Sequence, residues 1–212
     1  HSSGYFFVYL NHIETKMRQY TSNVCKAKER TFYLRITYTR VGEKMNNEKI
    51  FLVKRAQRRD KEAFCKLINL HMKDMYRTAI AILANEEDAG DAMQDTILSC
   101  WEKIDTLKKA QYFKTWLTRI LINHCYDILR QKTVYVDLDQ CEEVSKYDEY
   151  NVEFKEALRS LDERYRLPME LFYGQGYKVK EIADLTSLPQ NTIKTYLSRG
   201  RKQLAKYYRA EV

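Results

Sequence analysis

The sequence predicts an all-α protein made of two helical domains joined by a flexible acidic linker. Its 212 residues include only 2 Pro and 6 Gly, and apolar residues recur at helical spacing on both sides of one irregular segment. That segment, residues 133–152, is rich in Asp and Glu and has neither a helical nor a strand period, as expected of a linker. We therefore place a first helical domain at residues 45–132 and a second at residues 153–210.

Residues 1–44 differ in style from the rest of the chain. Residues 1–4 look like the remnant of a purification tag, and residues 30–41 alternate apolar and polar side chains with the period of a strand. The codons of Gly42 and Glu43 can contain a purine-rich ribosome-binding sequence shortly ahead of Met45. We expect Met45 to be the natural start, a hypothesis that a tryptic peptide from before Met45 in the native host would refute. The alternative is an accessory segment of unknown role.

The first domain is predicted to hold a helix or helix pair from residue 47, then helices at residues 86–104 and 112–132. Asn85 ends the first stretch and caps the next helix. His124 and Trp116 fall on the buried stripe of the third helix, so we expect them in the core or at its boundary. The apolar stripe of the first stretch comprises Phe51, Phe64, Leu67, Ile68, Met72, Met75, Tyr76, Ala79, Ile80 and Leu83.

The charged residues of the chain are segregated. The net charge of +8 favours a polyanionic partner, yet residues 85–105 carry seven acids against Lys103 alone. Acids in the first turn suit the positive end of a helix dipole, but Asp91, Asp95 and Glu102 lie further along. At least one partner other than nucleic acid is therefore implied.

Residues 179–207 predict a helix-turn-helix. Ile182 lies on the inner face of a short first helix, and Ser187 falls at the turn, where Gly is common. Pro189 opens a second helix that carries Ile193 and Leu197 at helical spacing. The outward positions of this helix can donate hydrogen bonds: Gln190, Asn191, Lys194, Thr195, Ser198, Arg199 and Lys202. Because residues 185–210 contain no acid, the helix suits a phosphate-lined groove. The alternative is a solvated basic helix in an ordinary bundle.

Catalytic and metal chemistry are not indicated. The five cysteines form no CxxC pair, which disfavours a zinc site and a disulfide framework, and we expect them to be small buried hydrophobes in a reducing cytosol. Neither a phosphate-cradling Gly-rich loop nor a nucleophile with its base is evident. No apolar run approaches the length of a membrane span. The sequence thus predicts a non-enzymatic cytoplasmic protein without a cofactor or metal.

Three motifs in order resemble those of bacterial RNA polymerase sigma factors of the extracytoplasmic-function class, group IV of the sigma-70 superfamily. They are DAGDAMQDT (residues 88–96), FKTWLTRILINHCYDILR (residues 113–130) and PQNTIKTYLSRGRKQL (residues 189–204). The resemblance covers residues 47–208. It implies that the first domain is sigma2-like and the second sigma4-like, in a transcription initiation factor that directs core RNA polymerase to specific promoters.

The resemblance also implies roles for individual residues. The acidic helix would bind core polymerase through Asp91, Gln94, Asp95 and Glu102. The next helix, with the loop of residues 105–111, would open and read the promoter's minus-10 box through Arg119, Asn123, Tyr126 and Arg130. The last helix would read the minus-35 box through Asn191, Thr192, Lys194, Thr195, Ser198, Arg199, Arg201 and Lys202.

The implied partners are core RNA polymerase, contacted at its beta-prime clamp helices and beta flap, promoter DNA and an anti-sigma factor. The acidic linker would pass near the positively lined RNA channel of the polymerase. The alternative is a free-standing helix-turn-helix regulator that binds an operator as a dimer. Such a regulator would bind duplex DNA unaided, whereas a sigma factor should gain promoter specificity only with core polymerase.

Overall fold

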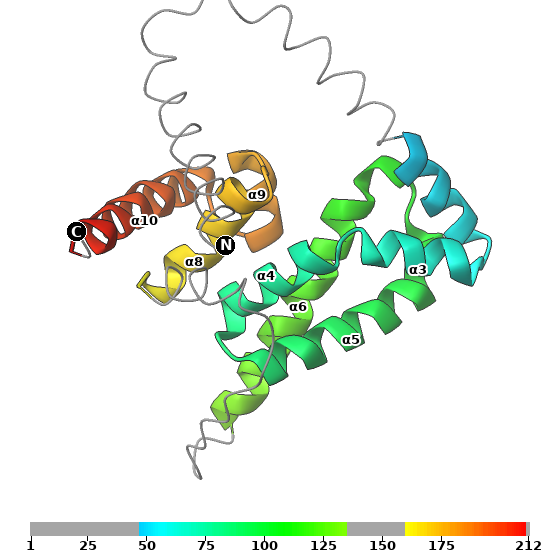
Figure 1. Cartoon of the computed structure of the whole chain (residues 1–212), viewed down its shortest axis with the longest axis horizontal. Coiled ribbons are helices and arrows are strands. Elements are labelled where there is room, and N and C mark those ends of the chain that lie inside the picture. Colours follow the sequence, from blue (N-terminus) through cyan, green and yellow to red (C-terminus); the bar gives the residue numbers. More distant parts are fainter. Residues whose placement is uncertain (1–46, 135–159, 211–212) are drawn as a thin grey trace, which may run out of the picture. The chain divides into compact units, whose positions relative to one another are not determined.

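The structure, a computed structural model, describes residues 47–134 and 160–210. Every regular element in these two stretches is helical, which confirms the predicted all-α class. The first stretch holds a helix of residues 47–57, α3 (Lys61–Asn69), α4 (Met72–Leu83), α5 (Glu86–Lys103), the short 3-10 helices η1 (Ile104–Thr106) and η2 (Ala110–Tyr112), and α6 (Phe113–Val134). The second holds α8 (Glu163–Met169), the π-helical turn η4 (Glu170–Gly174), α9 (Val179–Thr186) and α10 (Gln190–Ala210) (Figure 1).

Two predicted segments fall wholly or largely outside the described residues. The strand-like pattern of residues 30–41 is one of them, and the acidic linker is the other. Residues 133 and 134, which we assigned to the linker, continue α6 as helix. The helix predicted at residues 112–132 therefore begins one residue later and ends two residues later than expected.

Local capping residues set the ends of the helices in the first stretch. Asp60 precedes α3 and accepts a hydrogen bond from the Ala63 amide at 3.1 Å. Asn85 precedes α5 and accepts one from the Asp88 amide at 3.0 Å, as the sequence predicts. Both side chains satisfy a backbone donor that has no partner inside its own helix. Ala84, in the left-handed conformation, ends α4.

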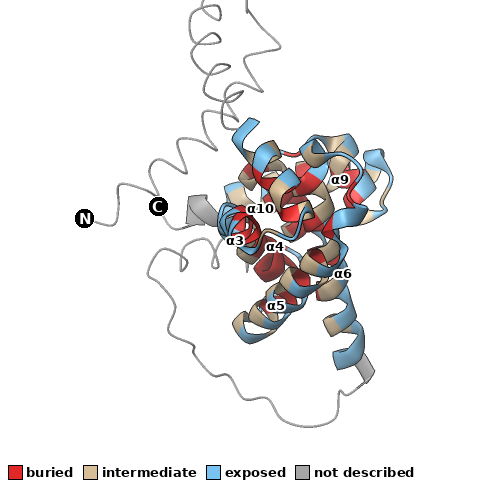
Figure 2. Cartoon of the chain, turned by 90° about the vertical axis from the view of Figure 1, so that its right-hand side faces the viewer, coloured by how far each residue is buried: buried red, intermediate tan, exposed pale blue. Residues whose placement is uncertain are grey.

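Each helix of the first stretch has one buried face and one exposed face (Figure 2). The α4, α5 and α6 helices pack on one another, with α3 completing the core. Leu67, Cys100 and Leu121 are among the fully buried side chains there. His124 lies at the boundary, where its Nε2 is 3.0 Å from the Ser99 hydroxyl. The buried faces of α5 and α6 are thus the ones that pack.

Three predictions about buried residues are wrong. Phe51 is 60 % exposed and Met72 is 39 % exposed, although both fit the helical period of the first stretch. That stretch is three helices and not one or two, so its period restarts at residues 58–60 and 70–71. Cys65 is also exposed, whereas Cys100 and Cys125 are buried. Burial raises the pKa of each of these two thiols to about 12, so both remain protonated.

The helix-turn-helix has the geometry that its spacing predicts. Ile182 and Ile193 are fully buried, and Leu197 is nearly so, which places them between α9 and α10. Ser187 ends α9 with φ 56°, in the left-handed region that favours Gly at this turn position. Lys178 directly precedes α9, and its amide donates to the Glu181 carboxylate at 2.8 Å. The rotation of α10 about its axis is therefore set by the two apolar side chains on its inner face.

Gly200 lets α10 approach α8. A Cβ atom at this position would lie 2.9 Å from both Cγ and Sδ of Met169 and 3.4 Å from Cβ of Tyr165. We expect Gly200→Leu to lower the free energy of unfolding by about 1–3 kcal/mol, because the added side chain overpacks this contact. Urea unfolding followed by circular dichroism measures the change. Gly90, which has open space around it, is the matched control, and an equal loss in Gly90→Leu would contradict the explanation.

A buried carboxylate joins the second stretch to α4. Glu170 in η4 is 3 % exposed, and its Oε2 accepts a hydrogen bond from Arg77 of α4 at 3.1 Å. Beside this pair, the Gln175 amide donates to the Asp74 carbonyl at 3.0 Å and to the Thr78 hydroxyl at 2.7 Å. The Glu170 carboxylate lies over Gly174, where a Cβ atom would be only 2.3 Å from it. The π-helical turn and its glycine thus make room for a buried acid.

Candidate nucleic-acid and protein interfaces

The residues predicted on α10 are all accessible to a ligand. Asn191, Lys194, Thr195, Arg199 and Lys202 are exposed. Thr192, Ser198 and Arg201 are partly exposed and flank the buried stripe. The exposed ones lie on the side opposite Ile193 and Leu197. The arrangement produces one continuous polar, basic face on a helix whose other face is fixed in the core.

The first turns of α10 differ from its later turns in chemistry. The Thr195 hydroxyl donates to the Asn191 carbonyl at 2.9 Å, which leaves its oxygen and methyl group available to a partner. Lys194 is exposed and lies one turn after Asn191, close to the helix N-terminus. Arg199, Arg201 and Lys202 follow further along. Short polar groups near the start and cations beyond them suit base edges and phosphates, respectively.

The predicted residues of α6 are also exposed, and one of them, Arg119, donates a hydrogen bond to the helix-turn-helix. Arg119, Asn123, Tyr126 and Arg130 all lie on the outer face of α6. The Arg119 guanidinium donates to the Asp184 carbonyl of α9 at 3.1 Å, and Arg130 pairs with Asp127 on the same helix. Asn123 and Tyr126 have neither a hydrogen bond nor an ion pair within the described residues. We find both hydrogen-bond donors and a π surface on this face.

Tyr126 borders a cavity of about 390 Å³ between α6 and the second stretch. Tyr126 is 43 % exposed, and its partial burial raises the pKa of its hydroxyl group. The other lining residues come from α8 and the helix-turn-helix: Asp162, Glu163, Arg164, Leu167, Pro168, Thr186, Leu188 and Tyr196. Tyr126 is therefore partly exposed and borders a space that residues of the second stretch also line.

The acidic side chains of α5 lie on one exposed face. Asp91, Gln94, Asp95 and Glu102 are exposed and follow the helical repeat along the axis. Leu98 lies in the middle of this row and is 62 % exposed. Sequence reasoning missed Leu98, although its position four residues after Gln94 and four before Glu102 could have indicated it. An apolar residue surrounded by acids suits a protein surface that carries both cations and hydrocarbon.

The described residues offer little for other chemistry. They contain no group of three or more His, Cys, Asp or Glu that could hold a metal ion. Among the described helices, none has the combination of length and apolarity that a membrane span requires. The described residues instead present exposed acids on α5 and exposed cations on α10.

Comparison with known proteins identifies the family. The model of sigma-70 region 2 matches residues 67–134, and that of sigma-70 region 4 matches residues 151–204. The RNA polymerase sigma factor SigV of Bacillus subtilis is 34 % identical over 137 residues, which is 62 % of this chain and 82 % of SigV. The extracytoplasmic-function sigma factor SigW of the same organism is 25 % identical over 177 residues, 74 % of this chain and 95 % of SigW. The chain belongs to the extracytoplasmic-function class of RNA polymerase sigma factors.

Solved structures share the fold of this sigma factor. RpoE of Bartonella quintana, in a complex with the anti-sigma factor NepR, aligns with a TM-score of 0.57 at 25 % identity and covers 70 % of this chain and 98 % of its own. CnrH, in a complex with the cytosolic domain of CnrY, aligns with a TM-score of 0.56 at 22 % identity. The alignment covers 78 % of this chain and 99 % of the CnrH chain. The predicted pairing of a sigma2-like and a sigma4-like domain is thereby confirmed.

The family membership also decides between the alternatives. A free-standing regulator would need only the helix-turn-helix, whereas this chain matches both sigma-70 regions in order. The sigma factor therefore directs RNA polymerase to promoters, and the dimeric regulator is not favoured. Sigma factors are a family of proteins that are not enzymes.

Proposed function

We propose that this sigma factor uses three separate helical faces for three ligands. The α5 face (Asp91, Gln94, Asp95 and Glu102) binds core polymerase at the beta-prime clamp helices. The α6 face reads the minus-10 box, and the α10 face reads the minus-35 box. In this proposal residues 45–132 are the sigma2-like domain, residues 133–152 the acidic linker and residues 153–210 the sigma4-like domain, which also contacts the beta flap.

One observation carries the proposal, namely the sorting of charge onto different helices. The α5 face is acidic, and α10 has no acid at all among its residues 190–210. A helix face that binds DNA would repel phosphate if it carried Asp91 and Asp95, so these acids favour a basic protein surface. The basic face of α10 instead favours the phosphate backbone. Opposite charges on separate rigid elements let one chain bridge a protein and a duplex.

In vitro transcription with core polymerase and a promoter library tests the proposal. The chain together with core polymerase should start RNA at a defined set of promoters. The chain alone should bind the same duplexes weakly and with little sequence preference. Tight, specific binding of the free chain to one duplex, with no transcription, would instead support an operator-binding regulator.

The α6 face has side chains that fit an unpaired strand. The Asn123 amide can pair with a base edge, and the Tyr126 ring can stack on an unpaired base. Arg119 and Arg130 can hold phosphate. Because Arg119 donates to Asp184 and Tyr126 borders the second stretch, both must leave these neighbours to contact DNA fully. We infer that the two stretches move apart when the minus-10 box is bound.

Lys194 and Arg201 should have different roles at the minus-35 box. We expect Lys194→Ala to change which sequences are preferred, because a good base contact is worth about 1–3 kcal/mol of discrimination. Arg201→Ala should weaken binding to all sequences alike, because it removes one phosphate contact. It should also reduce by about 1 the steepness with which the logarithm of the binding constant falls against the logarithm of the salt concentration. Binding of core-bound protein to minus-35 variants at several salt concentrations measures both. An equal loss on every sequence in Lys194→Ala would show that Lys194 reads no base.

We also propose an anti-sigma partner and a cytoplasmic location. The solved relatives RpoE and CnrH were captured with NepR, an anti-sigma factor, and with the cytosolic domain of CnrY. A partner of this kind would cover the α5 face and exclude core polymerase. It should therefore inhibit transcription in proportion to its occupancy, and a partner that binds without inhibiting would contradict the proposal. Neither a cofactor nor a catalytic residue enters this function.

A further inference from the structure

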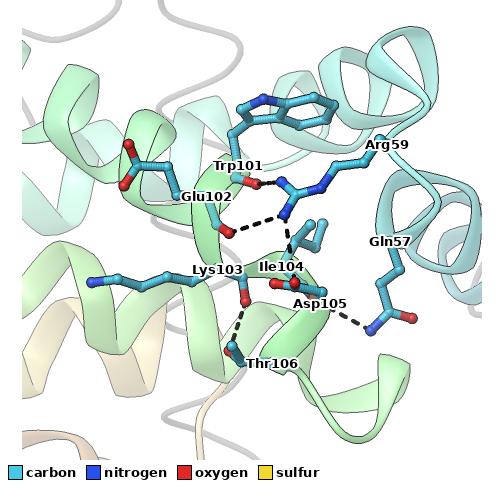
Figure 3. Close-up of polar contacts among 8 residues, drawn as sticks. All are labelled: Gln57, Arg59, Trp101, Glu102, Lys103, Ile104, Asp105 and Thr106. Carbon is cyan, nitrogen blue, oxygen red and sulfur yellow. Dashed lines mark hydrogen bonds and ion pairs between the residues drawn. The ribbon is translucent and has the colours of Figure 1, made fainter.

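The turn between the helix of residues 47–57 and α3 reaches the end of α5 (Figure 3). There the Arg59 guanidinium donates to the Trp101 carbonyl and, at 3.3 Å, to the Glu102 carbonyl. It also lies 3.5 Å from the Asp105 carboxylate and 5.6 Å from the centre of the Trp101 ring. The last carbonyls of a helix have no partner inside that helix. Arg59 supplies a hydrogen-bond donor to these carbonyls and places a cation at the negative end of the helix dipole.

Gln57 holds the next turn of the chain. Its side-chain amide donates to the Ile104 carbonyl at 3.2 Å and to the Leu107 carbonyl at 2.8 Å. These two carbonyls lie at the beginning of η1 and directly after its end, so one amide group spans the whole turn. We call Gln57 and Arg59 together the clip. Its two side chains bind four backbone carbonyls that lie 42 to 50 residues later in the sequence.

The backbone conformation of Arg59 is unfavourable for its residue type, which indicates that its side-chain contacts determine the residue at this position. Arg59 has φ 65°, in the left-handed region that disfavours residues with a Cβ atom. Gly or Asn would suit this turn better, but neither could reach Trp101 and Glu102. Local preference and long-range contact conflict here, and the long-range contact prevails. Such conflicts are expected where a residue serves function.

The clip fixes the segment that we propose reads the minus-10 box. Directly after Leu107, which is buried, the chain exposes Lys108, Lys109 and Tyr112. Tyr112 is 53 % exposed, and the Lys109 ammonium lies 6.0 Å from the centre of its ring. An aromatic ring beside a cation suits a single strand of nucleic acid, since every base can stack and every phosphate can pair. The geometry of these side chains depends on where the Leu107 backbone is held.

We propose that Gln57 and Arg59 are positioning residues for minus-10 reading, which hold the loop of residues 105–111 in its binding shape without touching DNA. The proposal rests on the assignment of this loop and α6 to the minus-10 box. It adds two residues that precede the matched sigma-70 region, which begins at residue 67. A purely structural cap would affect stability and every activity alike, whereas a positioning role affects minus-10 reading selectively.

The test compares Gln57→Leu and Arg59→Lys with Arg58→Ala, an exposed neighbour in the same turn. Gln57→Leu removes both amide donors at similar volume, and Arg59→Lys keeps the charge but loses the fork that spans two carbonyls. Each full-length variant, bound to core polymerase, is assayed on single-base variants of the minus-10 box and of the minus-35 box. The minus-10 set is repeated on promoters with a pre-opened minus-10 bubble. Polymerase affinity and melting temperature are measured alongside.

We expect Gln57→Leu to reduce discrimination among minus-10 variants roughly tenfold, the scale of one to two lost hydrogen bonds. The loss should persist on the pre-opened bubble, because it concerns reading and not melting. Discrimination at minus-35, polymerase affinity and the behaviour of Arg58→Ala should match those of the unchanged chain. Arg59→Lys should show a smaller loss of the same kind.

Three outcomes would overturn the positioning role. One is unchanged minus-10 discrimination in both clip variants, whatever their melting temperatures. Another is a parallel loss at minus-10, minus-35 and polymerase binding, which indicates general destabilisation. The third is a loss confined to duplex promoters, which indicates melting. If the unchanged chain itself starts no RNA with core polymerase, the proposed function fails first, and the two failures are therefore distinguishable.

Discussion

Asp95→Lys is expected to weaken the association of this sigma factor with core RNA polymerase by roughly 100-fold, with a matching loss of transcription. Close charge pairs across protein interfaces have coupling energies of about 1.5–7 kcal/mol, and each 1.4 kcal/mol is about a factor of ten in affinity. Reversal of the charge removes one such pair and adds a repulsion. Asp95 is exposed on α5 and has no ion pair within the described residues, so the change costs the fold little.

Glu62→Lys is the matched control for this charge reversal. Glu62 is exposed on α3 of the same domain, and its pairing with Lys66 lies in solvent, where such a pair contributes little. Both variants change the net charge equally, so the non-specific effects of charge are the same. Surface-plasmon or fluorescence titration of core polymerase measures the affinities. Comparable losses in both variants would refute a specific role for the α5 face.

The second large effect is expected at the buried pair of Arg77 and Glu170. Arg77→Met should lower the free energy of unfolding by about 3–5 kcal/mol well above pH 7, because there it leaves a buried carboxylate without its cation. Burial, opposed by the Arg77 charge and reinforced by Asp74, raises the pKa of Glu170 from 4.5 to about 7. Removal of Arg77 raises it further, so in acid the variant can protonate Glu170 and lose less stability.

The same pKa predicts how the stability of the unchanged chain depends on pH. Between pH 4.5 and about 7 the folded chain retains a proton on Glu170 that the unfolded chain has released. The stability that Glu170 contributes is therefore greatest below this window and falls as pH rises through it. Urea unfolding of the unchanged chain and of Glu170→Gln across the window isolates the effect. Identical pH profiles for the two proteins would exclude Glu170 as its source.

Much of the fold could be predicted because helical spacing alone identifies buried faces. Ile182, Ile193 and Leu197 are buried as their spacing in the helix-turn-helix predicts. The same spacing misled us at Phe51 and Met72, which are exposed. A period describes one straight helix, and it cannot show where one helix ends and another begins with a different rotation.

The features that could not be predicted depend on contacts far apart in the sequence. Nothing near Glu170 indicates a buried acid, because its partner Arg77 lies 93 residues earlier. Likewise the polar residues Gln57 and Arg59 resemble any solvated turn until the end of α5 is placed beside them. The candidate site residues of α5, α6 and α10 are accessible as expected, since exposed faces follow directly from the buried ones. Which base or protein group each one contacts stays a prediction.

The length of α10 has a consequence for promoter selection in cells. With 21 residues at about 1.5 Å each, the helix is a rod of roughly 30 Å, while the major groove is only about 12 Å wide. If α10 reads the minus-35 duplex as proposed, a straight rod of this length inserts its leading end and then emerges from the groove. Cations beyond that point, such as Lys206, then interact with the duplex only by long-range electrostatic attraction and not by direct contact. Under this proposal, a change in ionic strength would alter the affinity for every promoter and leave the ranking of promoters unchanged.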